Sequence, residues 1–181
     1  METKLKKKFE LMEKDKIAIF RKIKGLDNDL LNSPPEPGKW SIIQIFHHLI
    51  QAEEGTLNYI KKKTQSPEKL QNTGLIEKIK SKVLNYYLKS PKKWKAPEVV
   101  NKIPENDSLE NTVKSYDALR EEWLNFLNEM PKDWARKKIF RHPITGRMDM
   151  HMTLDFLDLH AKRHFKQIQS ILDLKFKKTP A

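Results

Sequence analysis

The stretch TLDFLDLHAKRHFKQIQSILDL, residues 153–174, carries the pattern that decides the fold and points to a site. Its apolar residues return every three or four positions, which predicts an amphipathic helix over this range. Two histidines lie on the apolar stripe, which consists of Leu157, His160, His164, Ile168 and Ile171. Residues four apart project from the same helix face, so we expect His160 and His164 to lie one turn apart.

This histidine pair is a candidate metal site, because two imidazoles one helical turn apart can share one metal ion. The alternatives are a pair on a polar surface or histidines that are hydrogen-bonded inside the core. Burial on an apolar stripe takes both rings out of water, and two adjacent buried imidazoles are harder to satisfy with hydrogen bonds than one. We therefore favour a metal ion held by His160 and His164.

A second long helix is predicted over residues 41–63. Ser41 and Gln44 have the spacing of a capping box, and Trp40 directly before them suits a hydrophobic staple. The helix carries the adjacent histidines His47 and His48. At about 100° per residue these two side chains point in clearly different directions.

His48 is the better candidate for the third ligand. It shares its helix face with Ala52 and Gly55, and a glycine inside a helix costs about 1 kcal/mol relative to alanine. Small residues at these positions leave space beside His48, which suggests a cavity. His47 is expected to lie behind the ligands or in the core. Three neutral imidazoles with an open fourth position are typical of a catalytic metal site, where water or a substrate thiolate could bind.

The other segments complete an all-α fold. Further helices are predicted over residues 2–24 and 75–88, and from a second capping box, Asp107 to Glu110, up to Pro131. Residues 32–38 and 89–107 are expected to be irregular, residues 142–146 to form a turn, and residues 175–181 to form a basic tail. No stretch alternates strongly enough to predict a sheet. We expect one domain, residues 1–181: a four-helix bundle with an additional short helix and long connections.

Composition excludes several classes of protein. The chain has no cysteine, which rules out disulfides, cysteine-based zinc sites and thiol nucleophiles, and which fits a cytoplasmic location. No apolar run approaches the roughly 20 residues that span a bilayer, so we expect no membrane partner. The lysine-rich residues 1–10 are not followed by a long apolar stretch, so they do not resemble a secretory signal.

The net charge of +12 has several interpretations. A basic surface can attract nucleic acid, an anionic membrane or an acidic small molecule. Lysine outnumbers arginine heavily, and the chain has no helix-turn-helix pattern, no RNA-binding aromatic motif and no arginine-rich stripe. We therefore interpret the charge as a solvated lysine-rich surface and expect no nucleic-acid partner.

Taken together, these motifs resemble the DinB/YfiT-like superfamily. The resemblance rests on Trp40-Ser41, Gln44, His48-Leu49 and the late His160-x3-His164-x2-Gln167-Ile168, and the turn His142-Pro143-x2-Gly146 is similar to the branch called DinB_2. It implies a four-helix bundle with one divalent metal ion, zinc or nickel, held by His48, His160 and His164. The resemblance also implies an enzymatic activity, since some members are thiol S-transferases and others are described as metal-dependent hydrolases.

Three functions remain open at this point. We favour a metal-dependent transferase that couples a small-molecule thiol to an electrophilic substrate. Hydrolysis by activated water is the alternative, and it would need a general base, for which Glu53 and Glu54 are the candidates on the second helix. Exposed helix carboxylates are usually only solvated, and Glu54 shares its helix face with His47 and not with His48, which disfavours hydrolysis. The third function is a metal-binding bundle without activity. A homodimer is an open oligomeric state.

Overall fold

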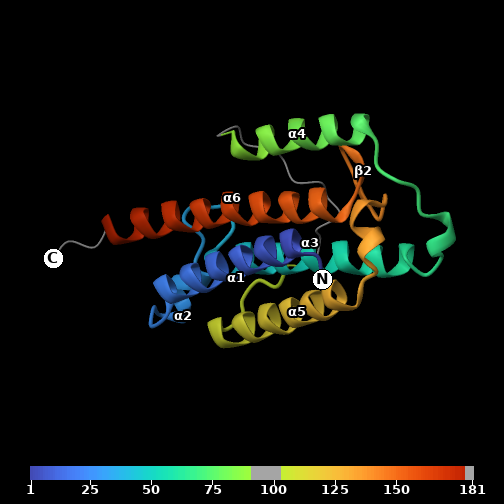
Figure 1. The fold of residues 1–181 in the computed structure, drawn as a ribbon. Coiled ribbons are helices and arrows are strands. Elements are labelled where there is room, and N and C mark those ends of the chain that lie inside the picture. The colour runs from blue at the N-terminus through green and yellow to red at the C-terminus, as the bar shows by residue number, and fades with distance from the viewer. Residues whose placement is uncertain (91–102, 178–181) are drawn as a thin grey trace.

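The computed structural model describes residues 1–90 and 103–177. Four long helices dominate this part of the chain: α1 (Thr3–Ile23), α3 (Ile42–Lys63), α5 (Leu109–Glu129) and α6 (Met150–Lys177). They close a ring in which α1 contacts α6, α6 contacts α3, α3 contacts α5, and α5 contacts α1 (Figure 1). The predicted four-helix bundle is therefore confirmed.

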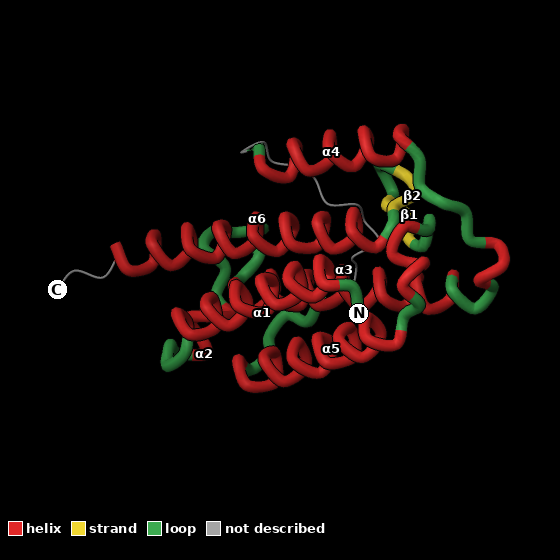
Figure 2. The backbone as a smooth tube through the Cα atoms, viewed as in Figure 1, coloured by secondary structure: helices red, strands yellow, loops and turns green. Residues whose placement is uncertain are grey.

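The shorter elements lie around this bundle (Figure 2). They are α2 (Asn28–Asn32), η1 (Pro67–Lys69), α4 (Leu75–Lys89), η2 (Lys132–Arg136), β1 (Phe140–His142) and β2 (Gly146–Met148). The additional short helix that the sequence predicts is α4, which packs against α6 and β2. Much of the predicted irregular connection, residues 91–102, and the end of the predicted tail, residues 178–181, lie outside the described residues.

Helix α1 shows how the local pattern sets the core. The residues that it buries are Leu5, Phe9, Met12, Lys16, Ile19 and Ile23, spaced three or four apart. Lys16 is the polar member of this stripe, and its ammonium group lies 2.7 Å from Asp117 and 2.9 Å from Glu13. Gly25 follows the helix with φ +86°, a conformation that favours glycine.

The two capping boxes have different outcomes. At α3, Gln44 N–H donates to Ser41 Oγ and Ser41 N–H donates to Gln44 Oε1, so the predicted box is formed. At α5 the prediction is wrong by one residue, because Ser108 is the N-cap and accepts from Asn111 N–H. Asp107 instead accepts from Ser108 N–H and contacts His47.

The segment before α6 corrects two further predictions. Residues 140–148 form a short antiparallel hairpin in which Phe140 pairs with Met148 and His142 pairs with Gly146. Its three-residue strands are too short for an alternating pattern to reveal them. Helix α6 begins at Met150 rather than Thr153, because Asp149 accepts from Met152 N–H at 2.9 Å and so caps the helix. It extends to Lys177, beyond the predicted end.

The tail that was predicted to follow Leu174 is partly helical and partly anchored. Lys175 lies in α6, and its ammonium group donates to the carbonyl oxygens of Leu30 and Ser33, near the end of α2. No helix among the described residues is long and apolar enough to cross a membrane.

Candidate metal centre

His48 on α3 and the α6 pair His160 and His164 come together between the two helices, with His48 buried and the other two partly buried. One ligand nitrogen from each ring lies within 4.8 Å of the other two. The ring centroids are 5.0 Å apart for His48 and His160, and 4.7 Å apart for the other two pairs. The rings meet at steep angles of 64° to 84°, so their edges converge and their faces do not stack.

This arrangement fits a metal ion. Two nitrogens held about 2.0–2.1 Å from one tetrahedral zinc ion lie roughly 3.3 Å apart. The Nε2 atoms of His48 and His160 lie 3.2 Å apart. Among the residues that the structure describes, these three histidines form the one group of three or more His, Asp or Glu side chains close enough to hold an ion. The donor set of three imidazoles leaves room for a further ligand.

The three rings are held in the uncharged form that binds metals. Burial lowers the pKa of His48 to about 4, and burial together with the nearby charge of His48 lowers the pKa of His164 to about 4. Burial and the neighbouring imidazoles lower the pKa of His160 well below its usual 6.5. His164 Nδ1 lies 3.0 Å from Gln167 Oε1, and because that oxygen only accepts, Nδ1 carries the proton and Nε2 keeps its lone pair.

The surroundings of the three rings are largely apolar and aromatic. The Trp40 ring lies 4.8 Å from His48, and Phe156 stacks on His160 at 5.6 Å with an angle of 19° between the planes. His48 itself is 5% exposed. Ala52 and Gly55 line the groove that contains the histidines, and a side-chain carbon added at Gly55 would meet nothing within 4 Å. The space expected beside His48 is therefore present, as an open groove.

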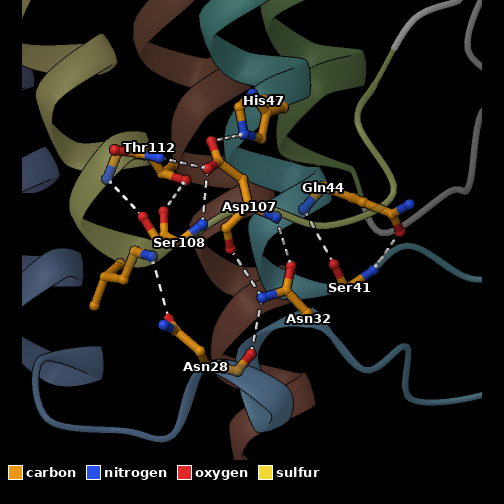
Figure 3. Close-up of polar contacts among 10 residues, drawn as sticks. Asn28, Asn32, Ser41, Gln44, His47, Asp107, Ser108 and Thr112 are labelled. Atoms are coloured by element: carbon orange, nitrogen blue, oxygen red, sulfur yellow. Dashed lines mark hydrogen bonds and ion pairs between the residues drawn. The ribbon is translucent and has the colours of Figure 1, made fainter.

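His47 lies outside the group of three. Its Nε2 lies 3.0 Å from Asp107 Oδ2, across the junction between α3 and the start of α5 (Figure 3). Asp107 N–H also donates to Asn32 Oδ1, so Asp107, which lies just before α5, links His47 on α3 to the last residue of α2. The role of His47 is thus to tie helices together, behind the face that carries His48.

The carboxylate candidates lie elsewhere. Glu53 is 1% exposed, where a solvated helix carboxylate was expected, and it accepts from Tyr116 Oη at 2.6 Å and Arg120 Nη2 at 2.7 Å. Burial raises the pKa of the Glu53 carboxyl, and Arg120 and the Tyr116 hydroxyl oppose the rise. Glu54 is exposed. Neither carboxylate lies in the group of three histidines. The expectation that Glu53 is solvated is wrong, because its carboxylate is buried against Tyr116 and Arg120 of α5.

Sequence analysis missed one polar side chain at the site. His142 was assigned only to a turn, but it lines the same groove as the three other histidines. Its ring lies 4.6 Å from Phe156, and its positive form would lower the pKa of His160. Burial lowers the pKa of His142 itself to about 4. Its position before the Pro143 turn was a signal, but the hairpin that aims the ring could not be predicted.

A sequence model described as the DinB superfamily matches residues 18–168. Among curated proteins, the uncharacterized protein YuaE of Bacillus subtilis is 22% identical over 156 residues, which cover 86% of this chain and 91% of YuaE. A Bacillus mycoides protein named "Putative metal-dependent hydrolase" is 28% identical over 155 residues, which cover 84% of this chain and 76% of that protein.

Two solved structures share the fold. YfiT from Bacillus subtilis, described as a probable metal-dependent hydrolase with an unusual four-helix bundle topology, superimposes with a TM-score of 0.61 at 14% identity, covering 97% of this chain and 90% of YfiT. The four-helix bundle protein TT2238 gives a TM-score of 0.55 at 17% identity, covering 92% of this chain and 97% of TT2238. At these identities the similarity establishes the architecture alone.

Proposed function

This chain belongs to the DinB superfamily, and from that premise we propose that it is a metal-dependent enzyme that transfers a small-molecule thiol to a small electrophile. His48, His160 and His164 would hold one divalent ion, zinc or nickel. The observation that carries the proposal is the convergence of three uncharged imidazoles from α3 and α6, with Nε2 atoms of His48 and His160 3.2 Å apart.

A donor set of three imidazoles favours an anionic substrate as the further ligand of the metal ion. Three neutral imidazoles leave the full double charge of the ion uncompensated, and no carboxylate of the described residues joins them. When bound, the metal supplies the positive charge that lowers the pKa of a thiol and favours its thiolate at neutral pH. The residues around it position the substrate and line the groove with apolar surface.

The protein's own side chains have distinct tasks in this scheme. Trp40 and Phe156 lie against two of the imidazoles and place an apolar surface beside the reacting sulfur. Gln167 accepts a hydrogen bond from His164 Nδ1–H, which keeps the proton on Nδ1 and leaves the lone pair of Nε2 free to bind the metal. In the reaction the thiol gives its proton to solvent, and sulfur forms a bond to an electrophilic carbon. The bond from that carbon to its leaving atom breaks, and the leaving atom keeps the electron pair and takes up a proton.

Hydrolysis is the second candidate, and the names of the relatives favour it. The Bacillus mycoides relative is named "Putative metal-dependent hydrolase", and YfiT is described as a probable metal-dependent hydrolase. The same three imidazoles would suit the activation of water. A hydrolase would also need a group that handles the proton of the attacking water, and Glu53 is occupied by Tyr116 and Arg120. For this reason we place thiol transfer first.

Cobalt substitution distinguishes these functions. Thiolate coordination to cobalt adds an intense band in the near ultraviolet, and the chain has no cysteine that could produce it. We expect the band to appear and saturate as 2-mercaptoethanol is added, and to be absent in His160→Ala. If thiols leave the spectrum unchanged while ester or amide hydrolysis depends on the metal, the hydrolase is correct. If neither occurs, the bundle binds metal without this chemistry.

A further inference from the structure

His142 is a buried polar side chain whose two ring nitrogens have different environments. The residue is 8% exposed and lies at the end of β1, where it pairs with Gly146 of β2. Its Nδ1 accepts hydrogen bonds from the backbone N–H groups of Ile144 at 3.2 Å and Thr145 at 3.4 Å. Gly146, with φ +83°, closes the turn that brings both amides to the ring.

These contacts fix the tautomer of the ring. An imidazole nitrogen that accepts from a backbone N–H carries no proton, so the neutral ring of His142 has its proton on Nε2. Within residues 1–90 and 103–177, no group accepts a hydrogen bond from that Nε2–H. The hairpin therefore holds a hydrogen-bond donor of known orientation that has no acceptor in the part of the chain that the structure describes.

The donor belongs to the groove that contains the candidate metal ligands. His142, His48, His160 and His164 all line it. The Phe156 ring lies against both His142, at 4.6 Å between centroids, and His160, at 5.6 Å. One aromatic side chain thus separates the ring of His142 from a candidate ligand, which places the two within reach of one small molecule.

We propose that His142 Nε2–H donates a hydrogen bond to an oxygen atom of the substrate. The proposal rests on the proposed function and narrows its substrate class to electrophiles that carry an acceptor oxygen, such as carbonyl compounds or epoxides, beside an apolar body. The apolar body suits Trp40, Phe140 and Phe156, which line the groove. A donor at that oxygen would stabilise the negative charge that develops there when sulfur attacks the neighbouring carbon. The competing role for His142 is structural, namely to hold the turn through Nδ1.

Two variants separate these roles. In His142→Asn the side-chain oxygen can replace Nδ1 as the acceptor for the Ile144 and Thr145 amides, but the distal donor is lost. In His142→Gln the longer side chain can supply a donor near the position of Nε2, but it does not reproduce the acceptor. A structural role predicts that Asn is tolerated and Gln is harmful. A substrate-binding role predicts the reverse for ligand affinity.

The experiment uses the cobalt-loaded protein and acetate as the oxygen-bearing probe, with chloride as a control ligand. The visible cobalt spectrum gives the Kd of each ligand. We expect His142→Asn to bind acetate about tenfold more weakly than the unmodified chain, which is the affinity that one hydrogen bond to a charged acceptor contributes. His142→Gln should stay within about threefold of it. Chloride affinity should be the same in all three proteins, because chloride has no oxygen atom that could accept a hydrogen bond from His142.

A metal-independent measurement accompanies the titration. The ¹⁵N spectrum of the histidine side chains should show His142 as the neutral ring protonated at Nε2, and a proton on Nδ1 would overturn the proposal. If the protein loads metal and binds chloride but His142→Asn binds acetate normally, the inference fails and the proposed function survives. If the purified protein holds no metal under any loading condition, the proposed function fails and the inference fails with it.

Discussion

The Nε2 atoms of His48 and His160 lie 3.2 Å apart although 112 residues separate them in the sequence. Two neutral nitrogens at this distance can share one proton or face one cation. His164 brings a third imidazole to the same point. A single proton cannot satisfy three rings, whereas a divalent ion can, and this relationship therefore underlies the first prediction.

Replacing either α6 histidine should remove the metal. We expect the unmodified chain to hold about one divalent ion, and His160→Ala and His164→Ala to hold far less, because two imidazoles rarely suffice for a tight site. Elemental analysis of purified proteins measures this. His151→Ala is the matched control, since His151 lies on the same helix but pairs with Glu2 at 3.2 Å. Retention of one ion by both site variants would show that the ligands are others.

The adjacent histidines of α3 should behave differently. His48→Ala should lose the metal, whereas His47→Ala should keep it. His47→Ala should instead lower the free energy of unfolding by about 1 kcal/mol, because it removes the half-buried contact with Asp107. Metal analysis and urea denaturation test the two effects separately. Loss of metal in His47→Ala with retention in His48→Ala would mean that the ligand assignment on α3 is wrong.

The metal-free protein should lose stability in mild acid. The folded-state pKa of His48 and of His164 is about 4, against an ordinary value of 6.5. Between these values the unfolded chain binds protons that the folded chain excludes, so the free energy of unfolding falls as the pH falls from 6.5 toward 4. The loss should reach roughly 3 kcal/mol for each imidazole.

Denaturation of the chelator-treated protein at several pH values measures this loss. His164→Ala should show a shallower slope than the unmodified chain, because one of the excluded protons is gone. A metal-free protein equally stable at pH 7 and pH 5 would contradict the burial of uncharged imidazoles. A bound metal adds stability to the folded state, so the comparison must use the metal-free form.

Glu53 should prove structural. Glu53→Ala leaves the Arg120 guanidinium buried beside Tyr116 without its main partner, and breaking a buried ion pair in this way costs about 3–5 kcal/mol. Glu54→Ala, at the adjacent exposed position, should change stability by less than about 0.5 kcal/mol. Denaturation measures both. The folded Glu53→Gln protein should still bind one metal ion, and loss of metal from a stable Glu53→Gln protein would assign Glu53 to the site.

The sequence determined those features whose causes lie within a few residues of one another. The buried stripe of α1, the capping box of Ser41 and Gln44, and the pairing of His160 with His164 on one face all follow from helical hydrogen bonds that span three or four residues. For the same reason the helical wheel could predict that the adjacent His47 and His48 point in different directions. The four-helix bundle follows once four such amphipathic stripes must be buried together.

Only the tertiary structure decided what depends on contacts between distant segments. Glu53 meets Tyr116 63 residues later in the chain, and nothing local to Glu53 distinguishes a buried partner of arginine from a solvated carboxylate. Asp107 joins His47 and Asn32 where a helix cap was predicted, because the junction of three segments offered it other donors. His142 reaches the groove because a hairpin too short to leave a periodic pattern turns it there. Such contacts are set by packing, which the order of residues along one element does not encode.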